Sequence, residues 1–77
     1  MLDKISNIIA EVLGVEKSEI TLDADFFHDF NADRVELADI VLKVQQAYQI
    51  EINEKHLNQI KTVSDLVNLV EENLDEF

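Results

Sequence analysis

Residues 30–37 read Phe-Asn-Ala-Asp-Arg-Val-Glu-Leu, and they end a long loop and begin the most regular amphipathic run of the chain. Asp33 stands three residues ahead of Glu36, which is the spacing of a capping box. In a capping box the first side chain accepts backbone N–H groups of the helix, and the second reaches back to the capping residue. We therefore predict a helix that begins at Asp33 and continues to about Gln49. Its apolar stripe consists of Leu37, Ile40, Val41, Val44 and Tyr48.

Three further helices are predicted around this one. Residues 2–13 carry an apolar stripe at spacings of three and four, and Gly14 directly afterwards is typical of a helix C-cap. Asn53 is a plausible N-cap for a short helix over residues 54–59, which would bury Leu57 and Ile60. Thr-Val-Ser-Asp at residues 62–65 caps a last helix, followed by a frayed acidic tail. Its stripe is Val63, Leu66, Val67, Val70 and Leu74.

These elements predict an all-α fold, a four-helix bundle with three long helices, one short third helix and a long loop between the first two helices. We expect one domain spanning residues 1–77. The loop over residues 14–31 carries three phenylalanines, so we expect it to pack over the helices as a lid, with a single helical turn at residues 18–20. Residues 50–52 should form an extended connector that buries both isoleucines.

The charge balance limits the partners. Seventeen acidic residues stand against six basic ones, which gives a formal net charge of −11. Nucleic acids and anionic membranes attract basic surfaces, so neither is an expected partner. Proteins with basic patches are expected instead. The chain has no cysteine and no long uncharged apolar run, so we expect a monomeric cytoplasmic protein without disulfides.

No catalytic constellation is visible. His28 and His56 lie on different elements, and the three serines occupy helix-surface or capping positions without a neighbouring base. Asp23, Asp25 and Asp29 could hold a hard cation loosely, although they lack the glycine and the terminal glutamate of an EF-hand loop. A solvated acidic surface is the simpler interpretation. Residue content therefore predicts neither an enzyme nor a metal site.

Several widely separated segments together resemble one known family. A helix ending in Leu-Gly-Val at residues 13–15 is followed by Asp-Phe-Asn-Ala-Asp at residues 29–33 and an acidic amphipathic helix. Ile-Glu-Ile at residues 50–52 and Ile-Lys-Thr-Val-Ser-Asp at residues 60–65 come next. In this order and spacing, the chain is similar to the acyl carrier protein family over essentially its whole length. The resemblance implies the same four-helix fold.

The resemblance also shows a departure. In the family the loop ends in Gly-Ala-Asp-Ser-Leu, and the serine carries a 4'-phosphopantetheine arm. Here residues 31–35 read Asn-Ala-Asp-Arg-Val, so Arg34 stands at the serine position and no cofactor is expected. The family presents its second helix to basic grooves of partner enzymes, although Lys43, Gln45 and Gln46 weaken the acidic pattern here. The resemblance implies partner-binding roles for Asp33, Arg34, Val35, Glu36, Asp39, Glu51 and Ile52.

Three functions remain open at this point. The first is a protein-interaction module associated with fatty-acid or polyketide biosynthesis, unable to carry an acyl group by the standard thioester route. The second is a non-covalent binder of an acyl chain, lined by Ile5, Leu37, Val41, Ile52 and Val67. The third is a carrier modified by a non-standard route. Arg34 is itself either a surface residue paired with Asp33 or Asp29, or a recognition residue on a changed docking face.

Overall fold

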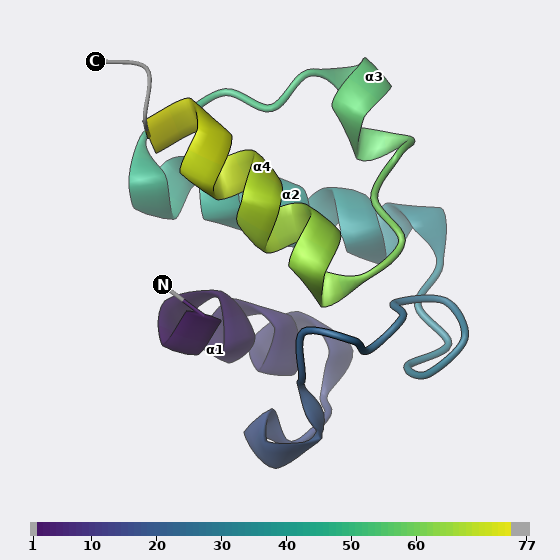
Figure 1. The fold of residues 1–77 in the computed structure, drawn as a ribbon. Helices are drawn as coiled ribbons and strands as arrows, with labels where there is room; N and C mark the ends of the chain where they lie inside the picture. Colours follow the sequence, from purple (N-terminus) through teal and green to yellow (C-terminus); the bar gives the residue numbers. More distant parts are fainter. Residues whose placement is uncertain (1, 75–77) are drawn as a thin grey trace.

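Four α-helices and one 3-10 turn make up the computed structural model, which describes residues 2–74 (Figure 1). The helices are α1 (Leu2–Leu13), α2 (Arg34–Tyr48), α3 (Glu54–Leu57) and α4 (Val63–Leu74), and the 3-10 turn η1 covers Lys17–Glu19. No strand forms within residues 2–74, although Asp25 and Thr62 make an isolated antiparallel bridge. The predicted all-α class is confirmed.

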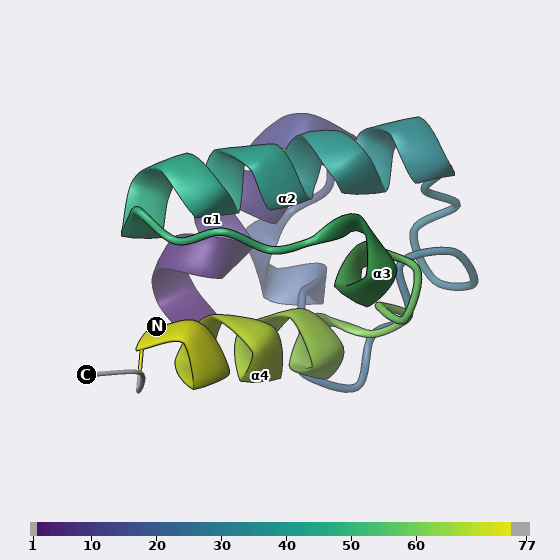
Figure 2. The ribbon, with the colours of Figure 1, turned by 90° about the horizontal axis from the view of Figure 1, so that it is seen from above.

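The three long helices surround one core. In Figure 1, α2 and α4 run in the same direction and α1 runs in the opposite one. Figure 2 shows the connector after α2 returning along that helix, so that α3 lies near the start of α2. The start of α1 and the end of α4 therefore lie at one end of the bundle, and the start of α2 lies at the other.

Local sequence sets the ends of α1 and α2. Gly14 has a φ of 69° and its N–H donates to the Ala10 carbonyl at 2.9 Å, which is the C-cap conformation that glycine adopts without strain. Asp33 caps α2: its Oδ1 accepts the Glu36 N–H at 2.7 Å, and Glu36 Oε1 accepts the Asp33 N–H at 3.1 Å. The capping box predicted from the sequence is confirmed. Gln49 ends the helix in a left-handed conformation with a φ of 55°.

A second reciprocal cap begins α4. The Asp65 carboxylate accepts the N–H groups of Lys61 at 3.0 Å and Thr62 at 3.1 Å, and the Asp65 N–H donates to the Thr62 hydroxyl at 3.2 Å. Burial alone would raise the pKa of Asp65. The two N–H donors and the Thr62 hydroxyl outweigh burial, so that the pKa lies below its usual value.

The core draws on every long element and on the loop. Side chains with less than 2% exposure come from α1, α2 and α4 and from the segments between them. They are Phe26, Ile5, Ile9, Ile40, Ile60, Leu66, Val44, Val63 and Val70. Most predicted stripe positions are buried, which confirms the helical periodicity, whereas Tyr48 and Leu74 are half-buried.

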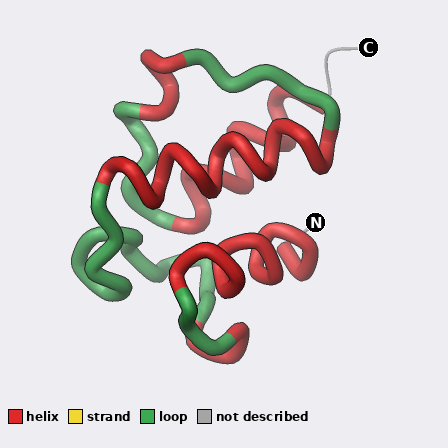
Figure 3. The backbone as a smooth tube through the Cα atoms, turned by 180° about the vertical axis from the view of Figure 1, so that it is seen from behind, coloured by secondary structure: helices red, strands yellow, loops and turns green. Residues whose placement is uncertain are grey.

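The long loop is a packed lid, as predicted, and it is tied to the start of α4. The Phe26 N–H donates to the Lys61 carbonyl at 2.9 Å, and the Ala24 carbonyl accepts the Val63 N–H at 3.0 Å. The Leu22 carbonyl accepts the Ser64 N–H at 3.0 Å. Figure 3 shows this green segment crossing one end of the helices. These hydrogen bonds pair backbone groups of the loop with the start of α4 in the absence of a regular strand.

Several boundaries and burial predictions need correction. The second helix begins at Arg34 and ends at Tyr48, with Asp33 and Gln49 outside it as caps, and α3 ends at Leu57 rather than Gln59. Ile50 is only half-buried, because the connector turns one isoleucine partly toward solvent. Ser6 lies 3% exposed inside α1 and is not a surface serine.

The single turn in the loop begins at Lys17, one residue earlier than predicted. The predicted frayed tail at residues 75–77 lies outside the described residues. In residues 2–74 we find no helix with both the length and the apolar content that a bilayer crossing requires.

Candidate functional site

The loop enters α2 through an unusual backbone conformation. Asn31 has a φ of 53°, in the left-handed region where glycine is favoured and asparagine is the best tolerated of the other residues. Ala32 follows with 7% exposure, and its N–H donates to the Phe26 carbonyl at 2.9 Å. Asp33 then caps the helix, so that residue 34 is the first helical position and stands on the surface.

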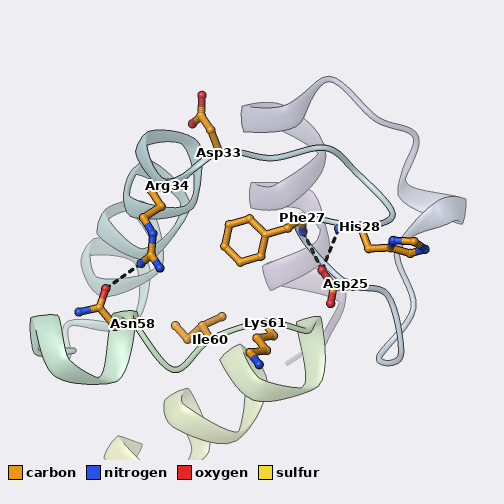
Figure 4. A pocket seen from close by; sticks show the side chains of 8 residues that line it. All are labelled: Asp25, Phe27, His28, Asp33, Arg34, Asn58, Ile60 and Lys61. Atoms are coloured by element: carbon orange, nitrogen blue, oxygen red, sulfur yellow. Dashed lines mark hydrogen bonds between the residues drawn. The ribbon is translucent and has the colours of Figure 1, made fainter.

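Arg34 reaches from this position toward the end of α3. Its Nη1 donates to Asn58 Oδ1 at 2.8 Å, and both side chains are exposed (Figure 4). The predicted pair with Asp33 or Asp29 is wrong. Asp33 is used in the helix cap, and the Asp29 carboxylate accepts the Asp25 N–H at 2.7 Å. Among residues 2–74 the guanidinium has no carboxylate within ion-pair distance.

An open pocket of about 770 Å³ lies beside Arg34. Its walls come from the lid, the start of α2 and the segment between α3 and α4. They are Asp25, Phe27, His28, Asp33, Arg34, Asn58, Ile60 and Lys61. In Figure 4 the Phe27 ring points toward Arg34 above Ile60, whereas the Asp33 carboxylate points away from the guanidinium. His28 also points outward.

The lid wall of this pocket is fixed by Asp25. Its Oδ1 accepts the Phe27 N–H at 2.8 Å and the His28 N–H at 2.9 Å. The His28 N–H is the largest cause that lowers the pKa of Asp25, and the Phe27 N–H and the charge of Lys61 add to it. Asp25 therefore acts as an ionised turn residue. Since Asp29 is also bonded to the backbone, the two carboxylates hold the lid together.

The cation site considered for Asp23, Asp25 and Asp29 does not form. Within the described chain, no three carboxylate or imidazole groups converge as metal ligands would. Asp25 and Asp29 direct oxygens to backbone N–H groups, and Asp23 is exposed next to them. Asp25 and Asp29 therefore stabilise the loop by accepting its backbone N–H groups.

The predicted partner-binding residues divide between two places. Asp33 is exposed as the cap of α2, and Arg34, Val35 and Asp39 are exposed on the first half of the helix. Glu36 is half-buried in the capping box. Val35 keeps 78% of its surface exposed, and Leu42, one heptad further on, keeps 50%. Glu51 is exposed on the connector after α2. Ile52 is only 8% exposed, so its prediction as a surface contact is corrected: it belongs to the core.

Gln45 was predicted to lie on the surface of the docking helix, and the structure places it elsewhere. It is half-buried, and its Oε1 accepts the Ile52 N–H at 2.6 Å. Gln45 therefore holds the connector against α2, whereas Gln46 is exposed to solvent. The residues considered as the lining of an acyl-chain site all belong to the hydrophobic core. They are Ile5, Leu37, Val41, Ile52 and Val67.

Sequence reasoning missed Phe27, Asn58, Ile60 and Lys61 as neighbours of Arg34. Asn58 lies 24 positions away from Arg34, and no periodicity or motif links them. The contact depends on where the connector places α3, which only the packed structure shows. The hydrogen bond of Phe26 to Lys61 was similarly invisible, because it joins two irregular segments.

The fold places this chain among small four-helix domains with a long first loop, and comparisons with known proteins identify its family. The family model described as "Phosphopantetheine attachment site" matches residues 3–70. An acyl carrier protein from Coprothermobacter proteolyticus is 38% identical over 74 residues, covering 96% of this chain and 90% of that protein. One from Petrotoga mobilis is 37% identical over 75 residues, covering 97% and 88%.

Solved structures show the same architecture. The acyl carrier protein from Thermotoga maritima aligns with a TM-score of 0.83 at 22% identity, covering 95% of this chain and 85% of that one. The one from Enterococcus faecalis aligns with a TM-score of 0.78 at 26% identity, covering 94% and 91%. The chain belongs to the acyl carrier protein family. Its members are carrier proteins and not enzymes, which confirms the prediction from residue content.

Proposed function

We propose that this protein is an acyl carrier protein homologue that carries no phosphopantetheine arm and acts as a protein-interaction module beside fatty-acid or polyketide synthesis enzymes. One observation carries the proposal. Arg34 is the first residue of α2, directly after the capping Asp33, where the family motif Asp-Ser has its attachment serine. The left-handed backbone at Asn31 suits the glycine of that motif, which supports the alignment of the loop end.

The side chain at this position does not fit covalent attachment. A phosphodiester to the arm needs a hydroxyl oxygen, and an arginine guanidinium has only N–H donors and stays protonated. Arg34 instead donates to Asn58. The arm therefore has no acceptor atom at residue 34.

The other serines are poor substitutes. Ser6 is 3% exposed within α1, so a modifying enzyme cannot reach it while the protein is folded. Ser64 is half-buried in the first turn of α4, and Ser18 is exposed on η1. None of the three follows an aspartate. No observation favours the carrier modified elsewhere.

The surface that remains for partners is the outward face of α2. Val35 and Leu42 are exposed apolar side chains on one side of the helix, and Asp33 and Asp39 supply negative charge next to them. A partner with an apolar contact surrounded by basic residues would match this face. Its charges would set the encounter rate and selectivity more than the affinity. Glu51 on the connector adds to the acidic rim.

Incubation with coenzyme A and a promiscuous phosphopantetheinyl transferase, followed by intact-mass measurement, tests the proposal. The natural chain should keep its mass. The variant Arg34→Ser restores the Asp-Ser pair and should gain one phosphopantetheine group, which shows that the transferase recognises the fold. A gain by the natural chain would overturn the proposal. Failure of Arg34→Ser, while an ordinary carrier in the same assay is modified, would overturn the assignment of Arg34 as the residue that prevents attachment.

A further inference from the structure

We propose that the connector between α2 and α3 is an open strand edge that binds an extended, basic peptide segment of a partner protein. The connector covers residues 50–53, and the peptide lies in the pocket between it and the end of α4. This pocket is separate from the outward face of α2 with its exposed Val35 and Leu42, and Arg34 does not line it. The inference rests on the proposed function only in taking a protein as the partner.

The backbone of the connector is bonded to α2 on one side only. The Ile50 N–H donates to the Gln45 carbonyl at 3.1 Å, and the Ile52 N–H donates to Gln45 Oε1 at 2.6 Å. Within the described part of the chain, the N–H groups of Glu51 and Asn53 have no hydrogen-bond acceptor. Successive N–H groups of an extended backbone point to opposite sides. The two unpaired groups therefore point away from α2.

An extended backbone with one unpaired side is an edge that another strand can join. Asn53 has the extended conformation, with a φ of −77° and a ψ of 162°, and both Glu51 and Asn53 are exposed. Their N–H groups lie two residues apart, which is the spacing at which one side of a strand offers its donors. A peptide in extended conformation can accept both through its carbonyl groups, and such main-chain bonds supply the affinity in strand addition.

The pocket beside this edge has the polar groups that a peptide needs. Glu51 and Asn53 line an open space of about 490 Å³ together with His56 of α3 and Asn73 of α4. Figure 2 shows the connector passing between α2 and α4. Asn73 Nδ2 donates to the Leu69 carbonyl at 2.8 Å, so its Oδ1 has no partner within the described residues and can accept a peptide N–H. The pocket thus offers donors on the connector and an acceptor on α4.

Charge selects a basic peptide. Glu51 supplies the carboxylate among the described residues that line the pocket, and none of them is a lysine or an arginine. The whole chain has 17 acidic residues against 6 basic ones, so it attracts a cationic peptide and repels an acidic one. An arginine of the peptide can bind the Glu51 carboxylate through two N–H groups at once. The fitting occupant is therefore an arginine-bearing extended segment.

The experiment is an NMR titration of the full chain, at low salt, with the acetylated and amidated pentapeptide Thr-Val-Arg-Val-Thr. We expect saturable shifts in residues 50–56. The amide protons of Glu51 and Asn53 should move downfield because they gain acceptors, whereas that of Ile52 is already bonded and should move little. No saturable shift, or shifts confined to residues 33–42 of α2, would overturn the proposal.

Two altered peptides separate main-chain pairing from charge. N-methylation of the central Val-Arg-Val residues removes their N–H groups and keeps the charge, and it should abolish binding. Citrulline in place of arginine keeps the shape and removes the charge, and it should weaken binding about threefold, as expected for an exposed ion pair. Undiminished binding of the N-methylated peptide would refute strand addition, and undiminished binding of the citrulline peptide would refute the selection of a basic segment.

Two substitutions at Asn53 test the N–H group itself. Asn53→Pro and Asn53→Ala both lose the side-chain oxygen that caps α3, but only proline also removes the N–H. The φ of −77° at this residue suits proline. Asn53→Pro should bind the peptide about fivefold more weakly than Asn53→Ala, which is the effect of losing one hydrogen bond. Equal binding by the two variants would overturn the assignment.

A second pair of variants tests the carboxylate. Glu51→Gln removes the charge at the pocket, and Glu11→Gln removes the same charge from an exposed site on α1. Only Glu51→Gln should weaken binding, by about threefold. Equal weakening by both would reduce the attraction to net charge and overturn the site. Covalent modification of the natural chain in the transferase assay would refute the proposed function without changing this titration, so the two failures are distinguishable.

Discussion

Replacement of Phe26 by alanine should be among the most damaging single changes in this chain. The ring is fully buried, and its backbone joins the lid to Lys61 and Ala32. Loss of a buried phenylalanine side chain costs about 3–5 kcal/mol, because the apolar contacts are lost and a cavity remains. A domain of 77 residues has a total stability of about 4–12 kcal/mol at about 0.05–0.15 kcal/mol per residue. The variant should therefore lose a large part of its stability.

Phe27→Ala is the matched control, since the neighbouring ring is half-buried and faces the pocket. Full burial of a phenylalanine contributes about 1.5–3 kcal/mol, so the loss at residue 27 should be about 1 kcal/mol. Urea unfolding followed by far-ultraviolet circular dichroism gives both free energies. Equal losses for the two variants, or a loss below about 1 kcal/mol at Phe26, would refute the interpretation of the lid as part of the core.

The cap of α2, its outward face and the carboxylate that caps α4 permit three more tests. Asp33→Ala removes the acceptor for the Glu36 N–H and should lower the unfolding free energy by about 1 kcal/mol, as measured by urea unfolding. A change of less than about 0.3 kcal/mol would contradict the capping role of Asp33. The double variant Val35→Ser, Leu42→Ser should change the unfolding free energy by less than about 0.5 kcal/mol, because both side chains are largely exposed. A marked drop of the melting temperature would show instead that this face is packed. The pKa of Asp65 is below its usual value in the folded state, so its stabilising effect is complete above that usual value and is lost as pH falls through the folded-state pKa. Between about pH 5 and about pH 3, the melting temperature of Asp65→Asn should therefore fall by less than that of the natural chain. If the melting temperatures of the two proteins fall in parallel with pH, Asp65 makes no such contribution.

Much of the fold could be predicted because its signals are local. The Asp33–Glu36 spacing fixes the start of α2, and Gly14 fixes the end of α1, so these boundaries follow from residues a few positions apart. The lid could be predicted as packed from its phenylalanines. Its attachment through Lys61 could not, because a backbone bridge between irregular segments leaves no periodic pattern.

The site was less predictable for a similar reason. Arg34 was correctly singled out as exposed, but its partner was sought among the acidic neighbours in sequence. Those carboxylates are used by the backbone, so the guanidinium extends to Asn58 on another element. The alternating pattern of residues 50–52 correctly predicted that Ile52 is buried, and the surface role that the family resemblance implied for it was wrong. The hydrogen bond from its N–H to Gln45 holds the connector against α2.

The positions of the chain ends have a practical consequence. The start of α1 and the end of α4 lie at the end of the bundle opposite the start of α2 (Figure 1). An affinity tag, a fluorophore or an immobilising linker joined to either terminus would leave Arg34 and its pocket facing away from the point of attachment. The protein can thus be fixed to a sensor surface through its N- or C-terminus in an orientation that presents α2 to a partner in solution.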